Sequence, residues 1–309
     1  MIKSKIISVF IAGVFLLSGC GQEAHNLNHN PSIETPKLNE ENLVKEPTLD
    51  PAEEVVSIPD EQPAAKEETP VNPAPPAMPA ETENKSLSWY LKPNLEHTIP
   101  VIPASAQELL NEHQGFYIIP DDGSSKIYLT FDEGYELGYT PQILDTLQAH
   151  NIKATFFITG HYIKSQPELV KRMVNEGHMV ANHTWNHPNL AKVTPEKLAT
   201  EITSLAEEFE VLTNTPMAKY IRPPEGAYSE TSLSLTSQLG YKTVFWSLAF
   251  NDWDPNKQPG QDFSYKYVMD HIHPGAVILL HAVSKSNTEA LNDIIADLQK
   301  EGYVFALFE

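Results

Sequence analysis

The chain has 309 residues, which is room for two domains, but its composition changes so much along its length that only part of it can build a core. It carries 21 Lys and Arg against 41 Asp and Glu, a formal net charge of −20 at pH 7. This acidic balance argues against nucleic-acid binding, which relies on Lys and Arg to neutralise phosphates.

The first 20 residues have the pattern of an export signal. Lys3 and Lys5 form a charged start, an apolar segment follows, and the small residues LSGC end it. LSGC also resembles a bacterial lipobox, which implies cleavage before Cys20, a lipid on its thiol and anchoring at the outer face of the cytoplasmic membrane. The alternative is a secreted protein. Because Cys20 is the only cysteine, the chain can form no internal disulfide.

Residues 21–87 are predicted to be a disordered linker. Residues 21–86 contain 11 of the 25 prolines, and 14 acidic residues against four lysines. Such a segment cannot bury enough apolar surface to offset the entropy lost on ordering. We therefore expect an extended tether, followed by one globular domain over residues 88–309.

In that domain, short β-rich runs alternate with amphipathic segments. The runs are KIYLTF (126–131), ATFFITG (154–160), HMVANHT (178–184), KYIRPP (219–224), KTVFWSLAF (242–250), AVILLH (276–281) and YVFALF (303–308). Thr140–Pro141 and Thr194–Pro195 each resemble an N-cap followed by an early helical proline. Seven strands alternating with six helices predict an α/β fold with a parallel sheet covered on both faces, closed into a (β/α)7 barrel.

Polar side chains collect where the predicted strands end. They are Asp132 and Glu133 after the first strand, His183 and His187 after the third, Arg222 at the fourth, Asp252 and Trp253 after the fifth, and His281 at the sixth. The carboxyl ends of barrel strands meet at one mouth, where functional residues of such folds gather. We therefore expect these side chains to form one site.

The segment HTWNH spaces His183 and His187 four residues apart. On a helical turn, this spacing would place both imidazoles on one face. Neutral imidazoles are good ligands for zinc or a similar divalent ion, and one carboxylate would complete an open three-ligand site.

Five ordered motifs identify a family resemblance over roughly residues 125–309: TFDEG, HTWNH, RPPEGAY, NDW and LLH. They resemble the polysaccharide deacetylases of carbohydrate esterase family 4, whose NodB-homology domain is a distorted (β/α) barrel. FDEGYELGYTPQILDTL, FWSLAFNDWDP and HPGAVILLHAVS are most similar to the delta-lactam-biosynthetic de-N-acetylases of spore-forming bacteria.

The resemblance implies that Asp132 is the general base and that His183 and His187 bind a divalent metal, with zinc as the expected ion. Glu133 stands where the family has a metal-binding Asp, and it is one methylene longer. It is expected to contact the metal or its water; otherwise the two histidines bind the ion alone and more weakly.

The remaining motifs complete the implied mechanism. Arg222 would pair with Asp132, and His281 would protonate the leaving nitrogen. The backbone N–H of Tyr228 would stabilise the oxyanion, with Gly226 allowing close approach.

The substrate pocket is assigned to Leu279, Trp253, Asp252 and Pro223. Leu279 could equally be barrel core, and Trp253 could pack behind His281 or face the sugar. Ala249 replaces an Asp that many relatives carry, and Asp252 is a possible partial substitute.

These features predict a hydrolase of amide bonds that deacetylates peptidoglycan glycan strands as a monomer. The resemblance narrows the substrate to N-acetylmuramic acid lacking its peptide, giving muramic delta-lactam in the spore cortex. One alternative substrate is N-acetylglucosamine in peptidoglycan, chitin-like oligomers or exopolysaccharide. An alternative of another class is a tethered glycan-binding protein without catalysis.

Overall fold

The computed structural model describes residues 85–309; the predicted signal, Cys20 and most of the predicted tether lie outside this range. The helices are α1 (Ala104–Glu112), α2 (Thr140–Ala149), α3 (Gly160–Ser165), α4 (Pro167–Asn175), α5 (Pro195–Thr213), α6 (Glu230–Gln238), α7 (Gln261–His271) and α8 (Lys285–Lys300), with a 3₁₀ turn η1 (Pro224–Gly226). The strands are β1 (Leu87–Ser88), β2 (Lys126–Glu133), β3 (Thr155–Ile158), β4 (Met179–Asn182), β5 (Tyr220–Ile221), β6 (Ala227–Tyr228), β7 (Lys242–Thr243), β8 (Val277–His281) and β9 (Val304–Phe305).

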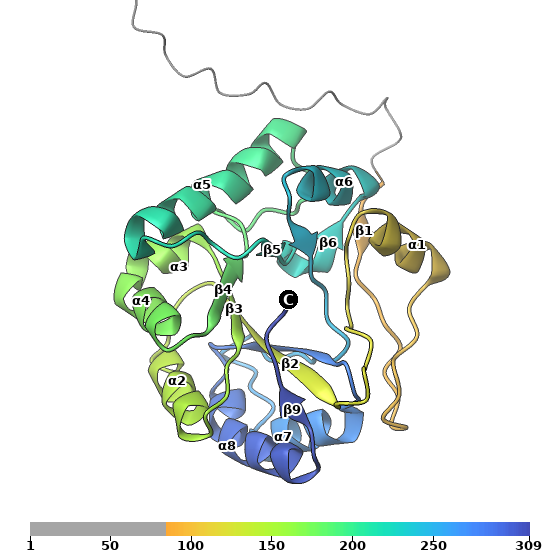
Figure 1. Ribbon diagram of the computed structural model, residues 1–309, viewed down its shortest axis with the longest axis vertical. Coiled ribbons are helices and arrows are strands. Elements are labelled where there is room, and N and C mark those ends of the chain that lie inside the picture. The colour runs from red at the N-terminus through yellow and green to blue at the C-terminus, as the bar shows by residue number, and fades with distance from the viewer. Residues whose placement is uncertain (1–84) are drawn as a thin grey trace, which may run out of the picture. The chain divides into compact units, whose positions relative to one another are not determined.

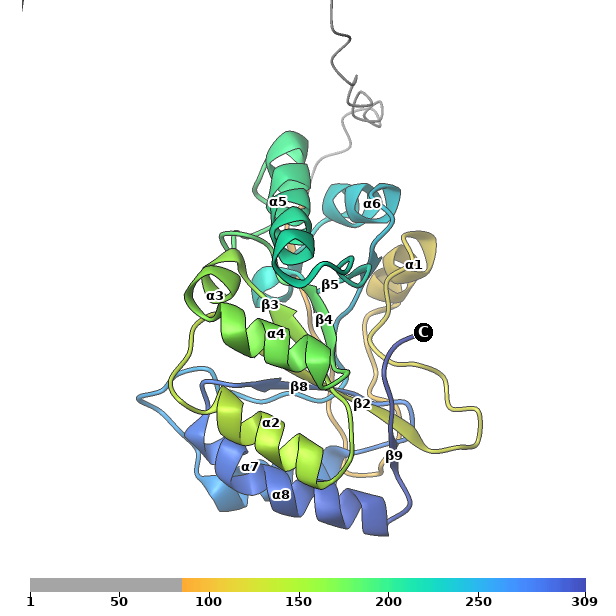
Figure 2. The same ribbon diagram turned by 60° about the vertical axis from the view of Figure 1, so that its left-hand side comes forward.

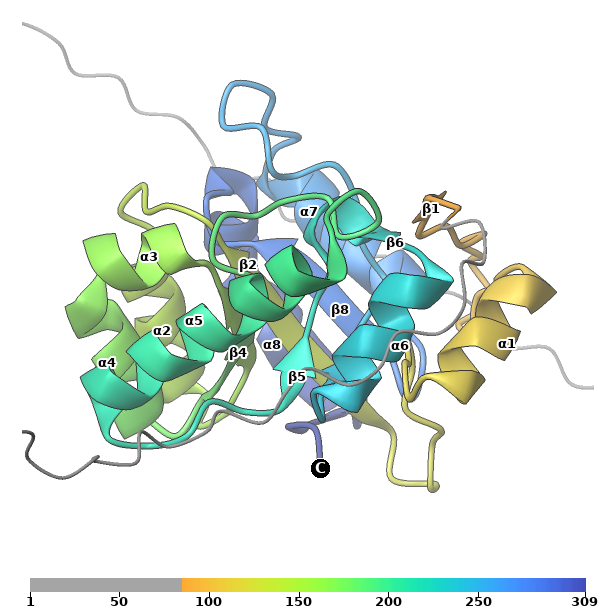
Figure 3. The same cartoon turned by 90° about the horizontal axis from the view of Figure 1, so that it is seen from above.

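The main sheet has the order β7-β5-β4-β3-β2-β8, and β9 pairs with the start of β2. All of these pairs are parallel. Beyond β7 the chain crosses to the other edge, where Leu248 forms a bridge with Ile278 of β8. The sheet therefore curls into a distorted barrel with the helices outside it (Figures 1 and 3), and the predicted fold class is confirmed.

Alternate residues of β2 enter two different cores, as the two-residue period of a strand requires. Leu129 and Phe131 belong to the cluster shared with the helices, and Phe131 stacks on Phe156 at 5.3 Å between ring centroids. Tyr128 belongs to a second cluster, with Phe157 and Phe308. Helices α2, α7 and α8 lie along one side of this sheet (Figure 2).

The segment before the barrel packs onto the loop that follows β5. Strand β1 pairs antiparallel with β6, placing Leu87 opposite Tyr228. The N–H of Trp89 then donates to the carbonyl of Gly226 at 2.8 Å, and the Trp89 ring stacks on Phe245 at 4.3 Å. Ordered structure thus includes Leu87, the last residue of the predicted tether.

The two predicted helix starts differ. Thr194 caps α5 by accepting a hydrogen bond from the backbone N–H of Lys197, as predicted. Thr140 instead lies inside α2 and its hydroxyl faces Glu133, so the predicted cap there is wrong. Within residues 85–309, no helix is long and apolar enough to cross a membrane.

Candidate active site

A pocket of about 620 Å³ opens at the carboxyl ends of the parallel strands. Its lining contains Asp132, Gly134, Tyr135, His183, His187, Pro223, Glu225, Gly226, Trp246, Ala249, Phe250, Asn251, Trp253, Leu279, His281 and Val283. A smaller pocket of about 340 Å³ lies at the opposite ends of the strands and contains none of the predicted residues. Most of the residues predicted from the sequence to form one site therefore line one pocket.

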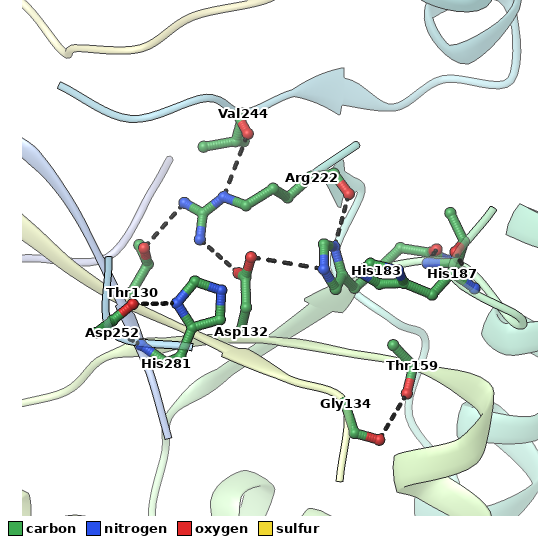
Figure 4. Close-up of polar contacts among 12 residues, drawn as sticks. Thr130, Asp132, Gly134, Thr159, His183, His187, Arg222, Val244, Asp252 and His281 are labelled. Carbon is green, nitrogen blue, oxygen red and sulfur yellow. Dashed lines mark hydrogen bonds and ion pairs between the residues drawn. The ribbon is translucent and has the colours of Figure 1, made fainter. Parts of the chain in front are cut away.

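Asp132 and Arg222 form a buried ion pair at the floor of this pocket. Arg222 donates from Nη1 to Asp132 Oδ1 at 2.7 Å and from Nη2 to Thr130 Oγ1 at 2.9 Å (Figure 4). The guanidinium also lies 4.1 Å from the ring centroid of Phe157. Burial alone would raise the pKa of Asp132, but Arg222, together with the neighbouring His183 and His281, outweighs burial and holds that pKa below its ordinary value.

His183 and His187 both line the pocket, with ring centroids 4.9 Å apart. They do not lie on a helical turn: Thr184 and His187 have φ of 70° and 55°, and the segment is an irregular bend. The Nδ1 of His183 is 2.8 Å from the carbonyl of Arg222, which fixes Nδ1 as the protonated nitrogen. Nε2 then faces Asp132 Oδ2 at 3.5 Å with a free lone pair, and burial lowers the pKa of His183 to about 4.

Glu133 does not lie with these histidines. It follows Asp132 on the same strand, so its side chain leaves the opposite face, where Thr140 Oγ1 donates to it at 3.3 Å. It is fully buried and does not line the pocket. Burial raises the pKa of Glu133 well above its ordinary value, and the nearby Glu136 carboxylate raises it further. The Glu133 carboxylate therefore lies away from the position of an ion held by His183 and His187, and the expected three-ligand arrangement is not present among residues 85–309.

The donor set fits a divalent ion only in part. The neutral imidazole of His183 and its neighbour His187 are suitable ligands at the pocket wall. However, residues 85–309 contain no group of three His, Cys, Asp or Glu side chains arranged to hold a metal ion. The two histidines fit, and the three-ligand set with Glu133 does not.

His281 lies beside Asp132, because the two residues are in register on the neighbouring strands β2 and β8. Its Nδ1 is 2.7 Å from Asp252 Oδ1, and its backbone N–H donates to Asp252 Oδ2 at 2.9 Å. Burial alone would lower the pKa of His281, but the Asp252 carboxylate raises it above its ordinary value. Asp252 thus orients the histidine from behind, as the substitution at Ala249 suggested it could.

The backbone donor near the pocket is Glu225 rather than Tyr228. In an antiparallel ladder, every second residue pair is hydrogen-bonded. Trp89 donates to Gly226, so the pair two positions along, Leu87 and Tyr228, is also a hydrogen-bonded pair. The Tyr228 N–H therefore faces β1. Tyr228 is also absent from the pocket lining. The oxyanion role predicted for Tyr228 therefore does not match its position.

The four neighbouring residues of this loop offer no free N–H. Residues 223 and 224 are prolines without an N–H, and the N–H groups of Gly226 and Ala227 donate to the carbonyls of residues 223 and 224. The N–H of Glu225 has no partner in the described part of the chain. Glu225 also has a φ of 59°, a strained conformation of the kind that clusters at functional sites.

The residues predicted to form the substrate pocket differ in position and exposure. Leu279 and Pro223 line the pocket, and Leu279 is also 4% exposed and so part of the core. Trp253 lines the pocket and is 51% exposed, with its ring edge-on to His281 at 5.9 Å. Gly226 has a φ of 62°, and a Cβ there would come within 2.8 Å of Trp246.

Sequence reasoning missed several supporting residues. Thr130 accepts from Arg222, and its position two before Asp132 on the strand could have indicated this. Glu201 of α5 accepts from the backbone and side-chain N–H groups of Asn186 at 2.6 and 2.7 Å, which holds the bend between the two histidines. Asn287 of α8 donates to Asp252, and no local signal marks it.

Comparison with known proteins shows the family of this chain. Residues 120–244 match the family model described as polysaccharide deacetylase. The chain is 44% identical over 225 residues, 72% of its length, to the peptidoglycan-N-acetylmuramic acid deacetylase PdaA of Bacillus subtilis, and covers 84% of that protein. It is 38% identical to a peptidoglycan-N-acetylglucosamine deacetylase of Bacillus cereus, covering 59% of this chain and 66% of the relative.

The solved structures give the same result. The structure of B. subtilis PdaA, described as a family 4 carbohydrate esterase, superposes with a TM-score of 0.70 at 44% identity. It covers 72% of this chain and 95% of the PdaA chain. Members of this family are hydrolases of amide bonds and are generally metal-dependent. The chain belongs to the polysaccharide deacetylases of carbohydrate esterase family 4.

Proposed function

We propose that this protein removes the acetyl group from N-acetylmuramic acid residues of peptidoglycan. The observation that carries the proposal is the pairing of Asp132 with Arg222 and of His281 with Asp252 at one pocket. The 44% identity to PdaA, whose name states that substrate, supports the choice of sugar.

Each group has a defined role in the hydrolysis. Asp132, kept ionised by Arg222, accepts a proton from the attacking water as the new C–O bond forms. The N–H of Glu225 donates to the carbonyl oxygen as negative charge develops there. His281, whose Nδ1–H is held by Asp252, donates its other proton to the nitrogen as the C–N bond breaks. Acetate and the sugar amine are released.

A divalent ion, for which zinc is our candidate, would be held by His183 and His187 and would lower the pKa of the attacking water. Two ligands hold an ion less tightly than three. We therefore expect the site to lose its metal readily to a chelator.

The finer substrate and the location are part of the same proposal. We expect strands stripped of peptide to be preferred, so that the freed amine can close on the lactyl carboxyl to give muramic delta-lactam during sporulation. Cys20 would carry the lipid that holds the protein outside the membrane.

Acetate release from two peptidoglycan preparations tests this function. One preparation is intact and the other has its peptides removed by an amidase, each with and without zinc. We expect deacetylated muramic acid, identified by mass spectrometry, from the peptide-free preparation with zinc. Deacetylated glucosamine would instead favour the activity named for the B. cereus relative. No acetate from either preparation would refute catalysis.

A further inference from the structure

A second layer of polar side chains lies behind the Asp252–His281 pair, outside the pocket lining. Asn287, in the first turn of α8, donates from Nδ2 to Asp252 Oδ2 at 2.5 Å. Both side chains are about 1% exposed. The Asp252 carboxylate is therefore enclosed by the Asn287 amide and by the backbone and ring of His281.

The Asn287 amide is satisfied on one side only. Its Oδ1 is buried and has no hydrogen-bond partner in the described part of the chain. The reversed orientation would point this oxygen at the Asp252 carboxylate, so the observed one is dictated by charge. A buried acceptor without a partner lowers stability, and an apolar side chain of similar size would avoid that loss. Stability alone therefore does not explain an asparagine at this position.

A second residue anchors the same loop to the start of α8. Gln258 donates from Nε2 to the carbonyls of Asp252 and Asp254, at 3.0 Å each. Its Oε1 accepts from the Ser284 hydroxyl at 2.7 Å and from the Ser286 N–H at 3.1 Å. The loop that carries Asp252 is thus held through its backbone by Gln258 and through its carboxylate by Asn287.

We propose that Asn287 is a positioning residue for the deacetylation. It keeps the Asp252 carboxylate aimed at the Nδ1–H of His281, so that the opposite ring nitrogen faces the breaking C–N bond. This inference rests on the proposed function, because it requires His281 to protonate the departing amine.

The test substitutes Asn287→Leu in the full chain and measures acetate release and thermal unfolding. We expect kcat to fall by about tenfold, because a misaligned His281 would lose part of the rate enhancement that a proton donor contributes. KM should stay within about twofold. The unfolding midpoint should be unchanged or higher. Ser264→Ala is the matched control: Ser264 is a buried side chain of α7 whose hydroxyl also lacks a partner, and it lies outside the pocket. Its kcat should equal that of the wild type.

A double substitution separates positioning from a general structural role. Asn287 should contribute nothing once Asp252 is replaced, so Asp252→Asn with Asn287→Leu should have the kcat of Asp252→Asn alone. Wild-type kcat in Asn287→Leu would overturn the inference. The inference would also be overturned if the effects of the two substitutions on kcat were additive and Asn287→Leu lowered the stability of the protein as well.

If Asn287→Leu does not fold, Asn287→Ala takes its place with the same expectations for kcat and KM. If the wild type releases no acetate, the proposed function fails and this inference fails with it. If the wild type is active and the Asn287 variants match it, only this inference fails.

Discussion

Asp132 and Glu133 are neighbours at the end of β2, and both are buried, yet they differ in every other respect. Asp132 faces the pocket and is paired with Arg222, whereas Glu133 faces the helices and accepts a hydrogen bond from Thr140. The pKa of Asp132 is lowered and that of Glu133 is raised. The face of the strand, more than the residue type, therefore decides which carboxyl group is charged and available for chemistry.

The largest difference is expected in activity. Asp132→Asn should lower kcat by roughly 10²- to 10⁴-fold, because it removes the proton acceptor. Glu133→Gln should keep most of the activity. Acetate release from amidase-treated peptidoglycan measures both, and a similar fall in the two variants would contradict the contrast.

The ion pair should also matter for stability and pH dependence. Arg222→Met leaves the buried Asp132 without its cation and should reduce the free energy of unfolding by about 3–5 kcal/mol. Because Arg222 lowers the pKa of Asp132, that pKa should rise in the variant, and the acid limb of the kcat profile should move to higher pH. Arg222→Lys keeps the charge and should show a smaller change in denaturant unfolding and in the profile. If the acid limb of the kcat–pH profile does not move in Arg222→Met, that limb reports the titration of a group other than Asp132.

Metal binding offers a third contrast. His187→Gln should weaken zinc binding by at least about tenfold, because one of the two ligands is lost. Glu133→Gln should change it by less than about twofold. Titration calorimetry on the full chain measures both affinities. Equal losses would place Glu133 among the ligands after all.

The smallest effect concerns stability against pH. Because the pKa of Glu133 is raised by folding, its contribution to stability is fully present below its unfolded pKa and is lost as pH rises through its folded pKa. Glu133→Gln should match the wild type near pH 4 and exceed it at pH 8 by about 1.4 kcal/mol for each unit of pKa displacement. Denaturant unfolding at both pH values checks this, with the exposed Glu168→Gln as control.

The barrel mouth was predictable because strand ends are local signals. KIYLTF and AVILLH are apolar runs that end on Asp132 and His281, and their register places the two residues side by side. The two-residue period of a strand also predicts that Glu133 points to the face opposite Asp132. The resemblance to the family, which has a metal-binding Asp at this position, predicts instead that Glu133 faces the pocket. That prediction of the side chain's direction is wrong.

The rest of the site depends on contacts between distant segments. Tyr228 loses its N–H to β1, which lies about 140 residues earlier in the chain, so the free donor at Glu225 could not be read from RPPEGAY alone. Asn287 meets Asp252 only because α8 begins behind β8. His183 and His187 approach each other through left-handed backbone at Thr184 and His187, which the spacing alone did not predict.

The short pairing of β1 with β6 has a practical consequence for where this enzyme can be cut. A fragment starting at Trp89 would retain every residue of the pocket lining but would lose Leu87 and Ser88, which hold Ala227 and Tyr228 in register. The Tyr228 N–H would then lose its partner in β1, and the loop that carries Glu225 would lose this anchor. Truncation or proteolysis just before Trp89 should therefore leave a folded barrel with impaired turnover, and the smallest fully active fragment is expected to begin no later than Leu87.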